Sequence, residues 1–534
     1  MTSVPGQATF ESDPATGAPA ASGLPRRAVT AVRAHWLFAI VFTAGLVLRV
    51  LAEVAYRPAI FYIDTMKYLY NSFPGADPVG YEVPLKAILA VGNLEVVTAV
   101  QHLLGLAMAI TIYLLLIRRG TWRWLAALAA APILLDAYQV QIEQTIMPDV
   151  WFEALILAGI AVLLTVRPGG RLVPALRAVI IAGLLLGLSA TVRQIGEILL
   201  LPGLLYLVAR GGGWRAMLVR SAGFTAAFAV PVIGYMAGSG LLTGHYWLAS
   251  ATPQLSTYGR MASAADCATL RIPAYERALC PTARQRAYGI DWLDHDRASP
   301  LKTFVAPPGM NRFAVIASFN QQVATQQPGR VIAAVARDAA NLFALTRTSS
   351  QGGTPISRWQ FQRGFAVYPG WVRVTPAGTI VLSVYPQASG GTLVRQRLTP
   401  SYGGTAQVST PLAAFLRSYQ LGGGYTPGLL MALFALAGLI GSVLALIWRI
   451  RPDARRIATD CLAFFGSGAI LLLASDAFQF SWRYQLPALI TLPPAGALAI
   501  AALVRLRSAR PAAQAGDDPG DDLAQASEQV GLRD

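Results

Sequence analysis

The sequence is poor in charged residues, and above all in lysine. Of its 534 residues 13% are charged, whereas an ordinary soluble domain has roughly 25%. Only three of them are lysines, Lys67, Lys86 and Lys302. Because 54% of the residues are hydrophobic and the mean hydropathy is +0.48, the composition excludes a soluble globular protein and predicts an integral membrane protein.

Cysteine is scarce as well, and several catalytic motifs are missing. No pair among Cys267, Cys280 and Cys461 has the C-x-x-C spacing and no histidines cluster, so there is no zinc motif. The chain also lacks a G-x-x-x-x-G-K-[ST] loop and a G-x-S-x-G elbow. ATP-driven transport and serine hydrolysis therefore have no support in the sequence.

The net charge of +16 would suit a nucleic-acid partner, but its distribution argues against one. The arginines occur in short runs between apolar segments, which is the pattern of cytoplasmic loops in membrane proteins. We therefore expect no nucleic-acid partner, and membrane lipids as the surroundings.

Apolar segments of about 15 to 24 residues recur along the chain, and a hydrocarbon layer of ~30 Å needs about 20 residues of helix. The first is too long for the core of a cleavable signal. We predict an α-helical polytopic membrane protein of about ten transmembrane helices, at 36–55, 94–117, 122–138, 150–166, 173–191, 195–209, 221–243, 428–448, 460–475 and 484–504.

Every second connection between these segments is basic, which by the positive-inside rule places both termini in the cytoplasm. The remaining connections, and the acidic residues in them, would then lie on the extracytoplasmic side. The basic residues are Arg26, Arg27, Arg33, Arg118, Arg119, Arg123, Arg167, Arg171, Arg177, Arg210, Arg215, Arg220, Arg449, Arg451, Arg455, Arg456, Arg505, Arg507 and Arg510. The outer connections are 56–93, 139–149, 192–194, 244–427 and 476–483.

The composition divides the chain into five parts. We expect residues 1–35 to form a disordered cytoplasmic leader, 36–243 a transmembrane core, 244–427 an extracytoplasmic insert, 428–504 three further spans and 505–534 a disordered cytoplasmic tail. The leader and the tail are rich in small and polar residues, which cannot bury enough apolar surface to offset chain entropy.

The insert predicts a small α+β unit. Residues 331–345 have helical apolar spacing, while 371–375 and 379–385 alternate as strands do. Cys267 and Cys280 both lie in the insert, on the oxidising side of the membrane, so a disulfide between them is expected. Two free buried cysteines are the alternative, and Cys461 is expected to pack inside a span.

Asp64, just beyond the first span, is the leading candidate for chemistry. A short helix after it would bring Asp64, Lys67 and Tyr68 to one face, because residues three and four apart are helical neighbours. The alternative is a solvated loop acid beside the membrane.

Three other outer connections carry candidate substrate-binding residues, each with a structural alternative. Glu143 could be a solvated loop acid, and Asp149, after Pro148, a helix cap. Arg193 and Glu197 could pair with each other instead of binding an anionic headgroup. Arg483 and Tyr484, next to Trp482, could belong to an interfacial aromatic belt. Arg49 and Glu53, inside the first span, are interpreted as a helix-stabilising pair.

The order of these motifs resembles that of the GT-C superfamily of polytopic glycosyltransferases, which includes protein O-mannosyltransferases, aminoarabinose transferases and arabinosyl transferases. The resemblance covers the first six spans and, more loosely, the last two. The matching stretches are Arg49…Asp64-x-x-x-Tyr68, Pro78-x-Gly80-Tyr81, Met147-Pro148-Asp149, Thr191-x-Arg193 and Arg483-Tyr484-x-x-Pro487.

The resemblance implies an inverting enzyme of the bacterial plasma membrane that moves a sugar from a polyprenyl-phosphate donor to an extracytoplasmic glycan, lipid or protein acceptor. Asp64 would be the general base. Arg193 and Arg483, with Lys67, would hold the lipid phosphate, and Asp149 or Glu143 would orient a sugar. The sequence requires no cofactor. The resemblance leaves open whether Asp64 and Asp149 hold a divalent cation, Mg or Mn.

A transporter or flippase of a lipid-linked or small polar substrate is the alternative, because transporters also place charged groups among their helices. Transporter sites, however, lie near the bilayer midplane between matching halves. Here the candidate residues sit at one surface, and no two halves of the sequence match.

Overall fold

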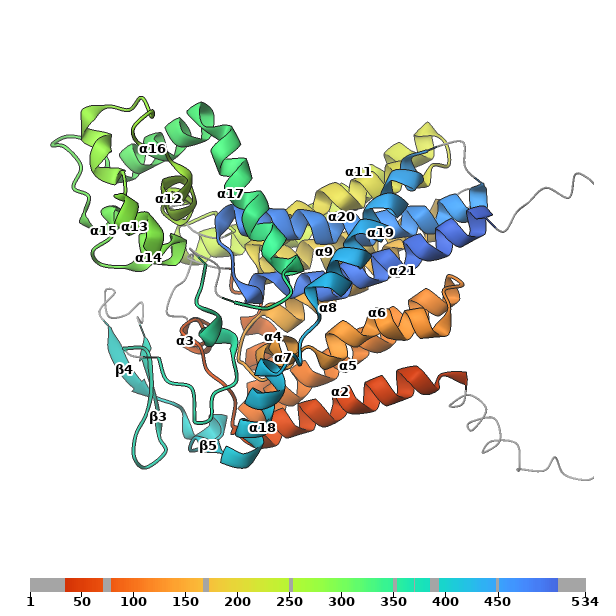
Figure 1. Cartoon of the computed structure of the whole chain (residues 1–534), viewed down its shortest axis with the longest axis horizontal. Helices are drawn as coiled ribbons and strands as arrows, with labels where there is room; N and C mark the ends of the chain where they lie inside the picture. Colours follow the sequence, from red (N-terminus) through yellow and green to blue (C-terminus); the bar gives the residue numbers. More distant parts are fainter. Residues whose placement is uncertain are drawn as a thin grey trace, which may run out of the picture.

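The computed structural model describes residues 34–70, 78–166, 172–248, 253–348, 353–368, 370–384, 393–447 and 451–507. Long helices form a bundle, and a smaller unit of short helices and strands caps one end of it, called here the insert end (Figure 1). Most of the predicted leader and tail falls outside the described residues. The bundle helices are α2 (Trp36–Ala55), α5 (Leu94–Arg118), α6 (Arg123–Leu135), α7 (Ala137–Glu143), α8 (Asp149–Leu163), α9 (Leu172–Val192), α10 (Leu200–Arg210), α11 (Trp214–Thr243), α19 (Gly428–Leu446), α20 (Pro452–Phe478) and α21 (Pro487–Arg507).

All ten predicted spans coincide with helices, but not all of these are long enough to cross a membrane. Among the described residues, seven helices are long and apolar enough, or eight if α6 and α7 count as one broken span. These two helices meet at an angle of 52°, where Asp136 caps α7 by accepting the Tyr138 N–H. Two of the predicted spans are short helices, α8 with 15 residues and α10 with 11. A count of ten spans is therefore not confirmed.

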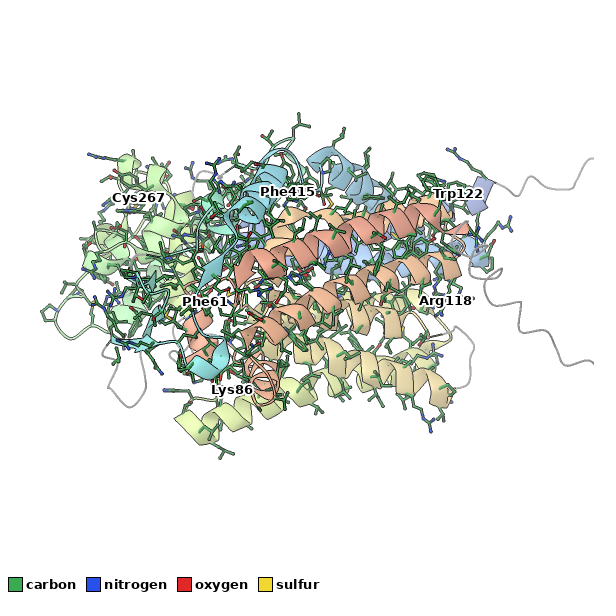
Figure 2. All side chains as sticks on the ribbon, turned by 90° about the horizontal axis from the view of Figure 1, so that it is seen from below. Phe61, Lys86, Arg118, Trp122, Cys267 and Phe415 are labelled. Atoms are coloured by element: carbon green, nitrogen blue, oxygen red, sulfur yellow. A yellow bond between two sulfur atoms is a disulfide. The ribbon has the colours of Figure 1, made fainter. Side chains whose placement is uncertain are left out.

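The described basic connections gather at the end of the bundle away from the insert. Arg119, which follows α5, and Arg210, which ends α10, both pair with the buried Asp460 of α20, at 3.0 and 3.1 Å. Figure 2 shows Arg118 and Trp122 at this end, and Phe61 and Lys86 near the insert. Basic and acidic connections thus sort to opposite ends, as the alternation predicts; Arg26, Arg27, Arg33, Arg167, Arg171, Arg449 and Arg510 lie outside the described residues.

The first half of the insert is helical. Its helices pack around a core that includes Tyr258, Leu293 and Phe319. The predicted disulfide between Cys267 and Cys280 is present beside this core. The elements are α12 (Pro253–Ala264), η2 (Ala274–Leu279), α13 (Ala283–Tyr288), α14 (Ile290–His295), α15 (Pro300–Thr303), α16 (Arg312–Gln326), α17 (Pro328–Ala340) and η3 (Asn341–Phe343).

The second half of the insert contains the strands, confirming a mixed α and β unit. The antiparallel sheet has the order β2-β3-β4, and a separate pair joins β1, after the first span, to β5, so that Tyr56 faces Val408. The insert is thus joined to the bundle by backbone pairing. The elements are β1 (Tyr56–Arg57), η4 (Ile356–Trp359), β2 (Val372–Val374), β3 (Ile380–Val384), β4 (Val394–Arg397), η6 (Pro400–Tyr402), β5 (Gln407–Val408) and α18 (Thr410–Leu421).

A buried ion pair fastens the insert to the bundle. Arg347 donates two hydrogen bonds to the Asp136 carboxylate, at 3.0 and 2.6 Å. Its guanidinium lies 4.7 to 5.0 Å from the ring centroids of Tyr138, Tyr425 and Trp482. A bidentate pair enclosed by aromatic rings holds one geometry, so the insert has a fixed position over the bundle.

The insert also contains a buried carboxyl group that predicts a pH dependence of its stability. Burial raises the pKa of Asp294 from 3.8 to about 8, although the Gly259 N–H donates to this carboxylate. Between these two values the folded state binds more protons than the unfolded state, so the free energy of unfolding falls as the pH rises. Asp294→Asn should flatten this dependence and raise the melting temperature at pH 8, measured by thermal unfolding of the full chain in detergent.

Asp296→Asn, which changes an exposed acid two residues further on, is the matched control and should leave the pH profile of the melting temperature as it is. Equal pH profiles for wild type and Asp294→Asn would contradict the prediction.

Candidate active site

Two turns that are far apart in the sequence are joined at the insert end. The Ile60 N–H donates to the Gln144 carbonyl at 2.9 Å, and the Ile146 N–H donates back to the Ile60 carbonyl at 3.1 Å. The Thr65 hydroxyl donates to the Ile146 carbonyl at 3.1 Å. These bonds place Asp64, just before α3 (Thr65–Tyr70), beside the turn that leads to Asp149.

The turn between α9 and η1 (Gln194–Leu199) is joined to the same region. The Gly80 N–H, just before α4 (Glu82–Leu89), donates to the Thr191 carbonyl at 2.9 Å. A Cβ at position 80 would lie 2.5 Å from that carbonyl oxygen, so only glycine fits this approach. The glycine of the Pro78-x-Gly80-Tyr81 motif therefore brings the loop against the end of α9, two residues before Arg193.

Asp149 is the centre of a buried charge cluster. It is the first residue of α8 and 1% exposed. The Arg483 Nε lies 2.9 Å from both of its carboxylate oxygens, and Arg193 Nη1 donates to one of them. The predicted alternative, an Arg193–Glu197 pair, is not what forms, because the guanidinium of Arg193 is directed to Asp149 instead.

Asp64 joins this cluster through the same arginine. Arg483 Nη1 donates to Asp64 Oδ2 at 3.0 Å, and Lys67 Nζ lies 3.0 Å from Oδ1. Burial by itself raises the pKa of the Asp64 carboxyl, but the charges of Lys67 and Arg483 outweigh it and hold that pKa well below its usual range. Asp64 is therefore ionised, and Arg483 bridges the two carboxylates.

A cavity of about 440 Å³ opens beside this cluster, a volume within the range of roughly 300 to 1,000 Å³ for small-molecule sites. Asp64, Arg193 and Arg483 all line it. The other lining residues are Tyr68, Pro78, Pro148, Val192, Gln194, Ile195, Glu197, Ile198, Pro253, Ser256, Thr257, Ser475, Phe478 and Tyr484.

The remaining predicted residues, except Glu143, take part in this site. Tyr68 lines the cavity and packs edge to face on Tyr81, with ring centroids 5.2 Å apart. The Arg193 guanidinium lies 4.9 Å from the Tyr484 ring centroid. Tyr484 is thus a support for the arginine as well as a wall of the cavity.

Glu143 is not where its prediction as a substrate-binding loop residue placed it. It is the last residue of α7, 0% exposed, and pairs with Arg49 at 2.7 Å. The interpretation of Arg49 and Glu53 as a pair is also wrong, because Arg49 pairs with Glu143. The Thr98 hydroxyl donates to Glu53 instead, at 3.0 Å. A buried carboxylate needs a charged partner. The bend between α6 and α7 directs Glu143 into the bundle, where it pairs with Arg49.

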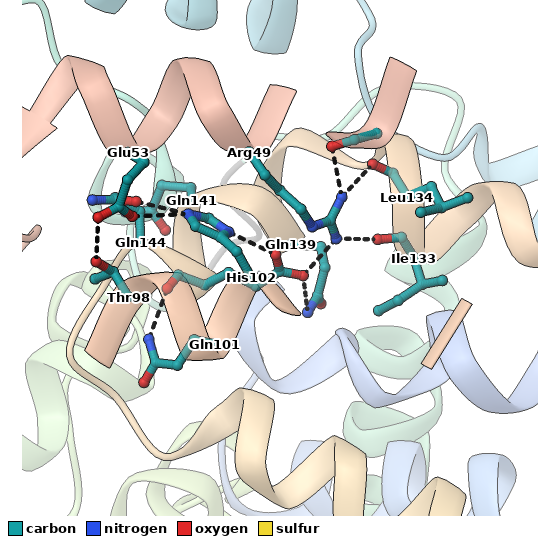
Figure 3. A network of polar contacts seen from close by, with 12 residues as sticks. Arg49, Glu53, Thr98, Gln101, His102, Ile133, Leu134, Gln139, Gln141 and Gln144 are labelled. Carbon is teal, nitrogen blue, oxygen red and sulfur yellow. Dashed lines mark hydrogen bonds and ion pairs between the residues drawn. The ribbon is translucent and has the colours of Figure 1, made fainter. Parts of the chain in front are cut away.

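Figure 3 shows a network of polar contacts that includes Arg49, His102 and Gln139, most of which sequence reasoning missed. His102 bridges Glu143 and Gln144, at 2.9 and 2.7 Å, and Gln139 donates to Glu143 at 3.2 Å and to Glu153 at 2.8 Å. The sequence signal for this network was the presence of polar residues inside apolar helices. Such residues are energetically costly in a membrane unless they face one another. The network holds α7, and with it the turn to Asp149.

Gln101 connects this network to the first loop and provides a test of its role. Its amide donates to the carbonyls of Glu143 and Thr145, at 2.7 and 2.9 Å, and accepts from the Tyr81 hydroxyl at 2.9 Å. Gln101→Leu should lower the free energy of unfolding by about 1–3 kcal/mol, because it leaves buried polar groups without partners.

Thermal unfolding in detergent measures this effect. Thr111→Val is the control on the same helix, because Thr111 is half-buried and its hydroxyl bonds to the Ala107 carbonyl of that helix. An equally small effect of both substitutions would contradict the prediction.

The carboxylates of the site do not fit a divalent cation. Asp64 and Asp149 are joined by Arg483 and are further held by Lys67 and Arg193. Among the described residues no group of three His, Cys, Asp or Glu side chains is arranged to hold a metal ion. To bind there, a cation would have to displace an arginine, and it would then have only two protein carboxylates as ligands. We therefore derive no step through a metal.

Comparison with known proteins yields similar solved structures but no family. No protein-family model matches the chain, and no curated protein matches it in sequence. The Pmt1-Pmt2 protein O-mannosyltransferase complex of S. cerevisiae, bound to the sugar donor, is 14% identical with a TM-score of 0.29. That match covers 40% of this chain and 34% of the other.

Two similar structures are oligosaccharyltransferases from Archaeoglobus fulgidus. AglB, in complex with an inhibitory peptide and a dolichol-phosphate, is 12% identical with a TM-score of 0.37, covering 90% of this chain and 53% of the other. A structure tethered with an acceptor peptide is 13% identical with a TM-score of 0.35, covering 88% and 50%.

The chain spans between a third and about half of the length of the solved chains it matches. At these TM-scores the likeness says nothing about the chemistry of this chain, which has to be argued from its own cavity.

Proposed function

We propose that this protein is a membrane glycosyltransferase that takes a sugar from a polyprenyl-phosphate donor and transfers it, with inversion, to an acceptor hydroxyl on the extracytoplasmic side. The observation that carries the proposal is the meeting of Arg193 and Arg483 with Asp64 in one cavity at the insert end. The acceptor would be a glycan, a lipid or a protein, and the cell membrane that of a bacterium.

The two arginines retain donors for a phosphate group. Within the described part of the chain, Arg193 uses Nη1 for Asp149, and Arg483 uses Nε and Nη1 for Asp149 and Asp64. No protein hydrogen bond occupies Nη2 of either residue there. Guanidinium groups bind phosphate oxygens with parallel hydrogen bonds. The cavity thus offers directed donors to an anion.

The charges around the cavity sum to zero, so the orientation of the N–H donors matters more for phosphate binding than the net charge of the site. Lys67, Arg193 and Arg483 are three cations beside two carboxylates, Asp64 and Asp149. Glu197, also on the cavity wall, brings the sum to zero. The phosphate would therefore be held by the N–H groups aimed at it rather than by a positive field.

Binding of the polyprenyl-phosphate sugar would also make Asp64 a stronger base. While Arg483 and Lys67 hold the Asp64 pKa low, Asp64 is a weak proton acceptor. A phosphate that takes over part of the Arg483 interaction would raise that pKa toward its usual value. Asp64 would then accept the proton of the attacking hydroxyl only when the donor is in place.

The transfer itself follows from these positions. The acceptor oxygen forms a bond to the anomeric carbon as its proton moves to Asp64. The bond from that carbon to the phosphate oxygen breaks on the opposite side, which inverts the configuration. The electron pair stays on the phosphate, whose growing charge Arg193 and Arg483 stabilise. Asp64 then releases its proton to water.

The direct test is to reconstitute the full chain in liposomes with radiolabelled polyprenyl-phosphate sugars and a delipidated cell-envelope extract. The wild-type chain is expected to move label from the lipid fraction to an acceptor fraction, and chromatography of that fraction identifies the product. Label that crosses the bilayer still attached to lipid, without transfer, would overturn the proposal in favour of a flippase.

A further inference from the structure

One wall of the cavity comes from the insert. Pro253, Ser256 and Thr257 of α12 line the same cavity as Arg193 and Arg483. Their spacing of three and four residues puts them on one face of the helix. The insert is therefore part of the site, and its side chains contact whatever the cavity binds.

This wall is rigid. The buried Arg260 donates from Nη2 to the Asp338 carboxylate of α17 and to the Asp476 carbonyl of α20, both at 2.5 Å. At the other side of α12, Asn320 of α16 donates to the Gln254 carbonyl at 2.8 Å and to the Thr257 hydroxyl at 3.0 Å. Groups held in this way are preorganised for a ligand.

Ser256 is the group on this wall that remains available. Thr257 accepts the amide of Asn320 and its hydroxyl points back to its own helix, 3.3 Å from the Pro253 carbonyl. Among the residues that the structure describes, no protein group hydrogen-bonds to the Ser256 hydroxyl, although Ser256 lines the cavity. A hydroxyl can both donate and accept, which suits a ligand that carries hydroxyls.

Glu197 and the aromatic residues complete a surface of the same character. The Glu197 carboxylate is not taken by Arg193, which pairs with Asp149. The Gln194 side chain hydrogen-bonds to it, but a carboxylate has about four acceptor positions. It would therefore repel a phosphate and still accept hydrogen bonds from hydroxyls. Phe478 and Tyr484, with ring centroids 6.5 Å apart, also line the cavity and offer an apolar face. Hydroxyl, carboxylate and aromatic groups together suit a carbohydrate ring.

We propose that Ser256 of the insert, together with Glu197, binds hydroxyl groups of the transferred sugar, so that the insert takes part in selecting the donor. This inference rests on the proposed function, in which the arginines hold the phosphate to which that sugar is attached. The insert is then a specificity element as well as a cover.

The test compares two classes of soluble probe on the purified full chain by isothermal titration. Farnesyl phosphate reports the phosphate site alone, and a panel of farnesyl-phosphoryl sugars (mannose, glucose, galactose and arabinose) reports the phosphate and sugar sites together. The dissociation constant of farnesyl phosphate divided by that of a farnesyl-phosphoryl sugar measures how much the sugar adds to the affinity. For at least one sugar, Ser256→Ala is expected to reduce this ratio about fivefold, and Glu197→Gln by a similar factor. The affinity for farnesyl phosphate should stay unchanged in Ser256→Ala, and it should not fall in Glu197→Gln, which removes a carboxylate that repels the phosphate.

Ser263→Ala is the matched control, because Ser263 lies on the same helix, bonds to the Arg260 carbonyl at 2.9 Å and does not line the cavity. An unchanged ratio in both Ser256→Ala and Glu197→Gln, or equal wild-type affinity for farnesyl phosphate and every sugar-bearing probe, would overturn the inference alone. Wild-type protein that binds neither class of probe would overturn the proposed function, and the inference with it.

Discussion

Replacing Asp64 by asparagine is expected to reduce sugar transfer by roughly 10²–10⁴-fold, the contribution typical of a general base. The amide keeps the size of the side chain and can still accept a hydrogen bond from Lys67 or Arg483, both 3.0 Å from the carboxylate. It cannot, however, take the proton of the acceptor hydroxyl. The initial rate of label transfer from a saturating polyprenyl-phosphate sugar measures the effect.

The fold of the Asp64→Asn protein should survive, because Asp64 is 23% exposed in its side chain and Asp149 keeps both of its arginines. A thermal unfolding curve checks this point. Asp296→Asn, an exposed acid of the insert, is the control and should transfer at the wild-type rate. Wild-type transfer by Asp64→Asn would remove Asp64 from the mechanism.

Replacing Arg483 by lysine is expected to lower transfer by about 10²–10³-fold, as when a donor aimed at a developing charge is lost. Arg483 holds Asp149 through Nε and Asp64 through Nη1, and its guanidinium lies 5.5 Å from the Trp359 ring centroid. A lysine keeps the positive charge but has one point of attachment, so it cannot bridge two carboxylates and still reach a phosphate.

Two readouts separate the effects of this substitution. The dissociation constant for farnesyl phosphate should rise, because Arg483 binds the phosphate in the ground state, and kcat should fall, because it stabilises the leaving phosphate. Arg312→Lys serves as the control, since Arg312 bonds to the carbonyls of Leu301 and Phe304 within the insert. If Arg483→Lys binds farnesyl phosphate as wild type does and transfers normally, the proposed role of Arg483 is wrong.

The buried position of Asp149 explains why alanine is a poor choice at position 483. Without Arg483, the Asp149 carboxylate, 1% exposed, would have only Arg193 as its charged partner. It would also lose both hydrogen bonds from the Arg483 Nε, which destabilises a buried carboxylate. An Arg483→Ala protein would confuse loss of phosphate binding with loss of structure, which the lysine variant avoids.

The amino-acid sequence by itself determined where the helices lie and which loops carry charge. Hydrophobic runs are local features, and each of the ten runs coincides with helix in the structure, although α8 and α10 are short. The alternation of basic and acidic connections also assigns Asp64, Asp149, Arg193 and Arg483 to one end of the bundle. Two cysteines in the insert were likewise enough to predict the disulfide.

Only the tertiary structure decided which charges meet. Glu143 and Arg49 lie 94 positions apart and form a buried pair, because the bend of 52° between α6 and α7 turns Glu143 inward. Arg193 pairs with Asp149 rather than with Glu197, four residues away. Ser256 gave no signal at all, since a serine on a polar helix has no distinctive pattern. Partners of this kind depend on distances between helices, which a pattern along one chain does not contain.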